Sequence, residues 1–504
     1  MKARLTLTVL ILIGVALHAP QPAFVQQTRD KAKATKSAAV DEKKNNEIEN
    51  FIMYAQAVPA EFSADLFIQL AESGEIKDAK RKQDLLVEAF QTASKAKEPL
   101  RVVALPGTAV DSRGGYRAAA ARAGLDTLSL QCRTIKALLP LNAKEARRLF
   151  TEIKLKSNPV DCESTLAYQV DCFFSTLEAV ANAAFSAEEM ERGEHVYFVE
   201  QYISKLNSAN QIGPAIKTIV SLKTTDLELA NLGRAFSAAL QKIPPDDRTF
   251  SAPWNTTMGS IDELVTKFNQ RGLPGDEMIE SYRTYLVNQL SGSRCADTAG
   301  KQRADLERRI VAQFNSRLLS ASYKKIAPIS DDEIKPAQRV GAAKHEPYWT
   351  SAKAKSILLQ VKRLRFNAAG KEVDEQSKQT AEWQSQLSQM VRDIAAWGAE
   401  DEKSEEDYFH QKSVIYQTLF KLIPIDKQHE GLLDEATRDF ATMLAGSALQ
   451  KEKPAEWFLH ARVLIDRVNN ADPAARQKLV NLINSSRSNV LHLYVQRQEL
   501  FKTK

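Results

Sequence analysis

Histidine, the side chain most often used for metal binding and acid–base chemistry near neutral pH, is scarce in this chain. Beyond the first 23 residues there are six: His195, His345, His410, His429, His460 and His492. No two of them are four residues apart, the spacing that places two zinc ligands on one helix face. Glu191 stands where an inverted zinc-protease motif ending at His195 would require histidine. The sequence therefore predicts no catalytic residue, no metal site and no cofactor.

A glycine-rich stretch over residues 106–116 contains basic residues suited to binding an anion. It lacks the Gly-Lys-Ser/Thr ending of a phosphate-binding loop, and no Gly-x-Ser-x-Gly nucleophile motif occurs in the chain. We expect this stretch to be a flexible loop. Arg113 and Arg117 could bind a carboxylate or a sugar acid of a partner, and an ordinary turn is the alternative.

Paired carboxylates would be needed by a glycan hydrolase, with one acid held in an apolar pocket. The densest acidic run contains Asp401, Glu402, Glu405, Glu406 and Asp407. It precedes an expected helix, so we interpret it as a solvated helix start, stabilised by the helix dipole. No lytic-transglycosylase signature follows the Glu-Ser pairs of the chain.

Two large aromatic residues, Tyr348 and Trp349, follow a proline in a segment without helical periodicity. They are candidates for docking a peptide or a sugar. The alternative is that they pack onto the following helices, because aromatic side chains bury large areas.

Four cysteines are candidates for disulfide bonds: Cys132, Cys162, Cys172 and Cys295. Four cysteines allow three pairings, and the sequence does not choose among them. The spacing of Cys162 and Cys172 fits neither a thioredoxin-type site nor a zinc knuckle.

The first 23 residues have the layout of a secretory signal peptide. Lys2 and Arg4 precede an uncharged apolar stretch over residues 5–17, and small residues and prolines follow. The apolar stretch is shorter than the about 20 residues of a membrane-spanning helix. We therefore expect export to the periplasm or the exterior, with no transmembrane anchor in the mature chain.

The charges also bear on the class of partner. The net charge is +6, and basic and acidic residues are interspersed along the chain without a one-sided basic stripe. This distribution argues against nucleic-acid binding.

Apolar residues recur at spacings of three and four almost throughout, which predicts helices. Examples are Phe62, Leu66, Phe67 and Leu70; Leu85, Leu86, Ala89 and Phe90; Ile261, Leu264, Val265 and Phe268; and Phe458, Leu459, Val463 and Leu464. Helix starts are indicated by Ser186, Thr225, Ser260 and Ser330, each followed three residues later by glutamate, and by Asn142 and Asp472. The best strand candidate, residues 100–105, has no evident partner.

These patterns predict an all-α protein of about eighteen helices, with antiparallel hairpins stacked as an irregular α-solenoid-like array or bundle. Tryptophans Trp383, Trp397 and Trp457 fall on core positions. We divide the chain into a signal peptide (1–23), a flexible leader (24–46), an N-terminal helical region (47–321), a proline-containing linker (322–349) and a C-terminal helical region (350–504).

A helical array without catalytic motifs favours a scaffold that binds a protein or peptide partner in the cell envelope. The alternative is an envelope glycan hydrolase with an unrecognised carboxylate pair. A deep pocket holding two carboxylates would favour the hydrolase, and a broad groove of apolar and mixed-charge residues would favour the scaffold. The oligomeric state is not predicted.

Overall fold

The computed structural model describes residues 42–97, 100–104, 112–156, 166–251, 254–296, 300–320, 325–335, 339–342, 351–367, 369–399, 405–424, 427–447 and 453–500. The chain divides into two compact units, residues 1–53 and residues 54–504. The described part begins with a helix over residues 42–56. Residues 42–46 of this helix belong to the expected leader. The expected signal peptide lies outside the described residues.

The predicted fold class is confirmed, because the described residues are mostly helical and contain 22 helices. Up to residue 320 they include α2 (Ala60–Glu72), α3 (Ala79–Ala93), α4 (Arg113–Ala121), α5 (Thr127–Leu138), α6 (Ala143–Phe150), α7 (Asp171–Ala183), α8 (Ala187–Glu191), α9 (Glu194–Ile203), α10 (Ile212–Ser221), α11 (Asp226–Leu240), α12 (Trp254–Gln270), α13 (Asp276–Ser291) and α14 (Gly300–Ser320). Then follow α15 (Ala352–Arg365), α16 (Glu375–Lys378), α17 (Ala381–Ala395), α18 (Glu405–Leu422), α19 (Glu430–Ser447), α20 (Pro454–Asn470), α21 (Pro473–Asn484) and α22 (Asn489–Leu500).

Local capping signals begin several helices, as predicted. The caps of α6, α8, α11 and α21 are Asn142, Ser186, Thr225 and Asp472. Ser330 begins only a short 3₁₀ helix, Asp331–Glu333. The prediction of a helix start at Ser260 is wrong, because α12 begins at Trp254 and continues through this residue.

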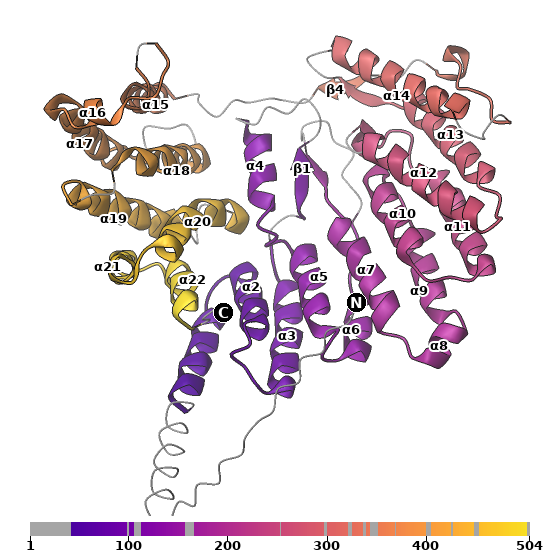
Figure 1. The fold of residues 1–504 in the computed structure, drawn as a ribbon, viewed down its shortest axis with the longest axis horizontal. Helices are drawn as coiled ribbons and strands as arrows, with labels where there is room; N and C mark the ends of the chain where they lie inside the picture. The colour runs from indigo at the N-terminus through magenta and orange to yellow at the C-terminus, as the bar shows by residue number, and fades with distance from the viewer. Residues whose placement is uncertain are drawn as a thin grey trace, which may run out of the picture. The chain divides into compact units, whose positions relative to one another are not determined.

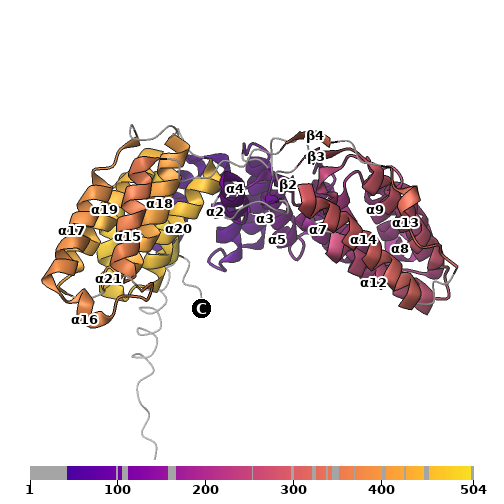
Figure 2. The same cartoon turned by 90° about the horizontal axis from the view of Figure 1, so that it is seen from above.

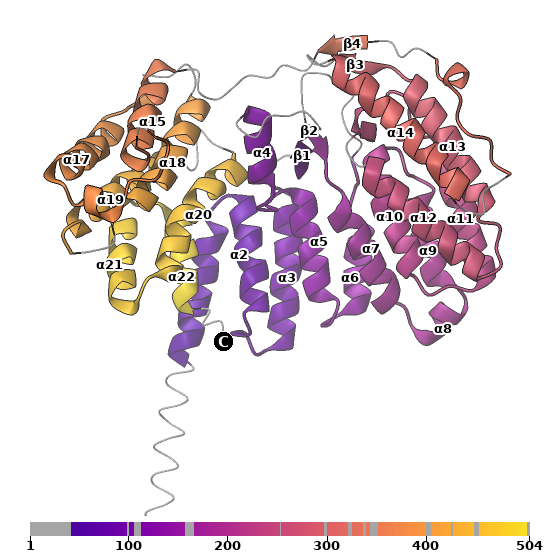
Figure 3. The same cartoon turned by 45° about the horizontal axis from the view of Figure 1, so that its top comes forward.

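Helices of the N-terminal half pack in two rows (Figures 1 and 3). One row consists of α2, α3, α5, α7, α10 and α12 in that order, and a second row of α9, α11 and α13 covers α7, α10 and α12. The predicted apolar stripes lie between neighbouring helices, and Phe62, Leu85 and Leu264 are fully buried. This arrangement is the helical array that the periodicity predicts.

The C-terminal helices form a further packed group, coloured orange to yellow in Figure 2. Contacts link α15 with α17 and α18, α19 with α17, α18 and α20, and α22 with α20 and α21. Trp383, Trp397 and Trp457 are buried in this group, which confirms the prediction that they are core residues. The indole nitrogen of Trp457 donates to the carbonyl of Leu444 at 2.9 Å.

The C-terminal group packs directly against helices near the beginning of unit 54–504. The ring of Phe62 in α2 lies 5.3 Å from the ring of Trp457 in α20 and 6.0 Å from that of Tyr494 in α22. The hydroxyl of Tyr494 donates to the carboxylate of Asp65 at 2.6 Å. Apolar packing and a buried hydrogen bond therefore join α2 to the last described helices.

Two small sheets interrupt the helices. The predicted strand is present as β1 (Val102–Ala104), and its partner, which the sequence did not reveal, is the antiparallel strand β2 (Leu166–Tyr168). Strands β3 (Arg294–Ala296) and β4 (Arg339–Ala342) pair in parallel. The loop expected over residues 106–116 is shorter than predicted, because Ser112 caps α4 and Arg113 already belongs to this helix.

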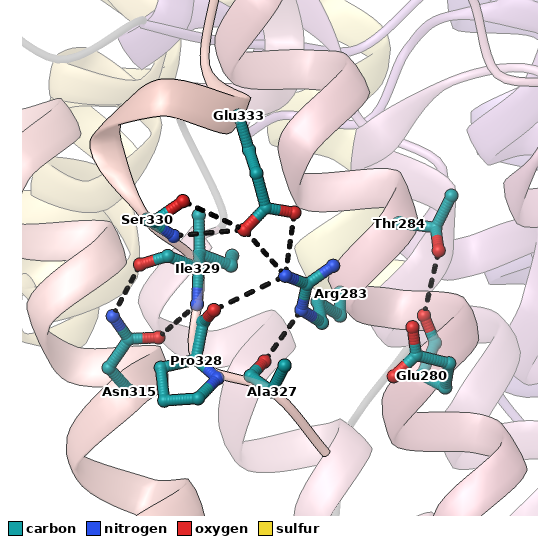
Figure 4. A network of polar contacts seen from close by, with 9 residues as sticks. All are labelled: Glu280, Arg283, Thr284, Asn315, Ala327, Pro328, Ile329, Ser330 and Glu333. Carbon is teal, nitrogen blue, oxygen red and sulfur yellow. Dashed lines mark hydrogen bonds and ion pairs between the residues drawn. The ribbon is translucent and has the colours of Figure 1, made fainter.

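Part of the expected linker is fixed to the N-terminal rows (Figure 4). Arg283 in α13 donates to the carbonyl of Ala327 at 2.7 Å and to the carboxylate of Glu333 at 2.7 Å. Asn315 in α14 accepts from the backbone N–H of Ile329 and donates to its carbonyl, both at 2.8 Å. Residues 325–335 are therefore held by side chains of two helices.

Candidate functional site

A groove of about 840 Å³ lies between α18, α19, α20 and α21, and we call it the α18–α21 groove. Its apolar lining comes from all four helices and includes Phe420, Leu433, Val463 and Leu479, each half-buried. A partner that covers these side chains would remove apolar surface from water, at about 25 cal/mol per Å².

The packing of α20 explains why apolar side chains are left in the groove. Its buried face consists of residues such as Trp457, Ala461 and Leu464. Of the predicted stripe on this helix, only Leu464 is fully buried, and Phe458, Leu459 and Val463 are half-buried. Because α20 carries apolar residues beyond its core face, one of them, Val463, remains available to line the groove.

Charged residues of both signs line the same groove. Four basic residues, Lys421, Lys427, Arg467 and Lys478, and four acidic residues, Glu430, Asp434, Asp466 and Asp472, line the groove. Lys478 of α21 pairs with both Glu430 and Asp434 of α19, the latter at 2.6 Å. The guanidinium of Arg467 lies over the ring of Phe420, 4.4 Å from its centroid.

The pKa of Glu430, a carboxyl group in the lining of the groove, is shifted by a basic neighbour. The hydrogen bond and charge of Lys478 lower the pKa of Glu430, so this carboxyl group is ionised near neutral pH. A general acid needs the opposite shift. Within the described part of the chain, burial raises the pKa of Glu72 and of Asp262. Asp262 faces a cavity of about 10 Å³, about the volume one water requires and far too small for a sugar.

A second groove, of about 750 Å³, lies along α6, α8 and α9. The guanidinium of Arg147 lies 4.4 Å from the ring centroid of Phe185 and pairs with Glu189 at 2.9 Å. Tyr197 in the same lining is 63% exposed. This groove also combines aromatic and charged side chains, but most of its lining is charged or polar.

The predicted anion-binding arginines face carboxylates of this same chain. Arg113 in α4 forms a two-nitrogen ion pair with Asp407, and Arg117 pairs with Glu406 at 2.9 Å and with Glu456 at 3.6 Å. These contacts join α4 to α18 and α20. Of the acidic run, Asp401 and Glu402 lie outside the described residues, and the other three residues form the first turn of α18. The interpretation of this run as a solvated helix start is wrong for Asp407, which is only 3% exposed.

Histidine and tyrosine side chains lie beside these ion pairs in the interior. The hydroxyl of Tyr116 is 2.7 Å from Nε2 of His460, and its ring centroid is 3.7 Å from that of His410. Burial, together with the charge of His460, lowers the pKa of His410 well below its usual value. The histidines are 50 residues apart in sequence, so spacing alone does not indicate this cluster.

The structure describes only some of the remaining predicted site residues. Tyr348, Trp349 and Cys162 lie outside the described residues, and for Cys295 the structure describes only its place in β3. Cys132 and Cys172 are described, and both are free thiols. In the residues that the structure describes, no group of three or more potential ligands forms a metal site.

No protein-family model matches the sequence, and no curated protein matches it significantly. Among the described helices, none combines the length and the apolar character needed to cross a membrane.

Proposed function

We propose that this protein is an exported helical scaffold that binds a protein or peptide partner through the α18–α21 groove. The observation that carries the proposal is the groove itself, whose lining combines apolar side chains with charges of both signs. The signal-peptide pattern of residues 1–23 supports a partner in the cell envelope.

The lining indicates what the partner segment presents. Apolar side chains of the segment would cover Leu433, Val463 and Leu479, the role of anchor residues in helix-in-groove binding. The groove has equal numbers of basic and acidic residues, so a segment with interspersed charges fits better than a polyanion or a polycation.

The test is capture of a partner by the mature chain, residues 24–504, from envelope extract, followed by titration of the identified partner. Leu433→Lys and Leu479→Lys place a charge among the apolar side chains. Each is expected to weaken binding about 10- to 100-fold, the equivalent of losing one apolar anchor. Circular dichroism and thermal unfolding establish that the variants fold.

Leu227→Lys is the matched control, since Leu227 is a leucine that is 70% exposed on α11. It is expected to bind like the wild type. If Tyr197→Ser abolishes binding while the groove variants keep it, the second groove is the binding site. Retention on peptidoglycan with release of sugars, and no protein partner, would replace the scaffold proposal with the glycan hydrolase.

A further inference from the structure

The second groove, along α6, α8 and α9, has a lining of a different chemical kind from that of the α18–α21 groove. Its apolar side chains are all aromatic: Phe185, Tyr197 and Phe198. In the described part of the chain, no leucine, isoleucine, valine or methionine lines it, whereas two leucines and a valine line the α18–α21 groove. The second groove therefore presents aromatic rings among polar groups and has no aliphatic pocket for an apolar anchor.

Two helices supply most of this lining with the same spacing. On α9 three of the lining residues are Glu194, Tyr197 and Gln201. On α6 and its C-terminal cap three are Lys144, Arg147 and Thr151. Within each set the positions are i, i+3 and i+7, so the three side chains share one helix face over about 10 Å. The buried ring of Phe150 in α6 lies 5.9 Å from that of Phe198 in α9, so aromatic packing connects the two helices.

Tyr197 presents the most accessible ring of the groove. It is 63% exposed, and among the described residues its ring packs on no other aromatic ring and its hydroxyl makes no hydrogen bond. Phe185 is half-buried, and the guanidinium of Arg147 lies over its ring. The C–H groups on the face of a sugar ring carry partial positive charge, which suits the negative face of an aromatic ring.

The charges of the second groove neutralise one another. Three basic and three acidic residues line it. All three acidic residues form ion pairs at 2.9, 2.8 and 2.8 Å, namely Glu189 with Arg147, Glu145 with Arg148, and Glu194 with Arg192. An ionic ligand would compete with these pairs. Hydroxyl groups can both donate to the carboxylates and accept from the guanidinium groups, so they can bind without breaking a pair.

Gln201 adds a carboxamide, which has both donors and an acceptor. Its side chain is exposed and makes no hydrogen bond with the other described residues. The volume of about 750 Å³ lies in the range of small-molecule sites. A ligand rich in hydroxyl groups, without net charge and with an apolar ring face, fits this combination.

We propose that the second groove binds a neutral oligosaccharide, with one sugar ring stacked on Tyr197 and its hydroxyl groups bonded to Gln201 and to the ion-paired side chains. This function is additional to the partner binding proposed for the α18–α21 groove and does not depend on it. The signal-peptide pattern of residues 1–23 supports contact with the polysaccharides of a cell envelope.

The experiment is isothermal titration calorimetry of the mature chain, residues 24–504, with chitotetraose and cellotetraose as neutral probes and trigalacturonic acid as an anionic one. At least one neutral probe is expected to bind with a Kd below about 1 mM. This Kd should stay unchanged between about 50 and 500 mM salt, because no ion pair forms on binding. Tighter binding of the anionic probe, or no binding of either neutral probe at about 10 mM, would overturn the proposal.

Variants locate the bound sugar. Tyr197→Ala is expected to weaken binding about 10-fold, whereas Tyr197→Phe keeps the ring and should stay within about threefold of the wild type. Tyr54→Ala is the control, because Tyr54 is 56% exposed in the helix over residues 42–56. Equal losses in Tyr197→Ala and Tyr54→Ala would contradict the assignment. Leu433→Lys, in the α18–α21 groove, should bind the sugar like the wild type, so the two proposals can fail separately.

Discussion

At the scale of single residues, the buried cluster of Tyr116, His410 and His460 is expected to make the stability of this protein depend on pH. His410 is 7% exposed and its ring contacts Tyr116 and lies near His460. A protonated imidazole at this position would be a charge in the interior between α4, α18 and α20. The neutral form is the one that the packing accommodates.

The stability of the protein is expected to decrease as the pH falls below about 6.5. Burial and the charge of His460 lower the pKa of His410 below its usual 6.5, so the unfolded chain binds a proton at higher pH than the folded chain does. The contribution of neutral His410 to the free energy of unfolding is fully present above pH 6.5. Below this pH it decreases by at most about 1.4 kcal/mol per pH unit. Denaturant titrations at pH 7.5 and 5.5 measure this difference in the free energy of unfolding.

His410→Gln removes this titrating group. The free energy of unfolding of this variant is expected to change less between the two pH values than that of the wild type. His492→Gln is the control, because His492 lies in α22 away from the cluster and bonds to Asn484. An identical pH dependence in His410→Gln and the wild type would show that another group is responsible.

Residue roles that depend on distant partners were not predictable from the sequence. Asp407 belongs to an acidic run that is typical of a solvated helix start, and its neighbour Glu405 is exposed as this pattern predicts. Its burial follows from Arg113, a residue 294 positions earlier. Nothing in the spacing of either residue indicates that α4 lies against α18.

At the scale of elements, helix starts were predicted well where the signal is contained in four consecutive residues. Thr225 and Glu228 form their capping box without help from the rest of the fold. Ser260 and Glu263 have the same pattern but lie inside α12, because the apolar stripe of this helix already begins before them. Strand β2 is three residues long, too short to show a period, and depends on its pairing with β1.

Residues 325–335 are expected to become mobile when Arg283 is replaced. Arg283→Gln removes the donors to the carbonyl of Ala327 and to the carboxylate of Glu333. Backbone amides in this segment should then exchange with deuterium at least about tenfold faster, the equivalent of about 1.4 kcal/mol of local stability. Hydrogen exchange followed by mass spectrometry measures this change.

Arg308→Gln provides the comparison, since Arg308 forms an exposed pair with Asp305 on α14. Such surface pairs contribute little to stability, so exchange in residues 325–335 should stay at the wild-type rate. Unchanged exchange in Arg283→Gln would mean that the contacts of Asn315 and Ser291 are sufficient to hold the segment.

At the scale of the whole of unit 54–504, the contact of α2 with α22 is expected to contribute strongly to stability. The carboxylate of Asp65 accepts hydrogen bonds from Gln69, Arg133 and Tyr494, each at 2.6 Å. Asp65→Ala leaves the buried Tyr494 hydroxyl and the partly exposed Arg133 without this acceptor. We expect a loss of about 3 kcal/mol in the free energy of unfolding, measured by denaturant titration.

Tyr494→Phe removes only one of the three hydrogen bonds and keeps the ring against Phe62, so a smaller loss of about 1 kcal/mol is expected. Tyr197→Phe alters an exposed tyrosine and should change stability by less than about 0.5 kcal/mol. Equal losses in the three variants would contradict the role assigned to Asp65.

The contact between α2 and α22 also has a consequence for the order in which this protein is made. Asp65 and Tyr494 are separated by 429 positions, so a ribosome needs on the order of tens of seconds to pass from one to the other. Throughout this interval Phe62 and its apolar neighbours lack their final cover. A nascent chain with such a face is expected to be a substrate for a holding chaperone. Helix α2 completes its packing only after α22, the last described helix, has been synthesised.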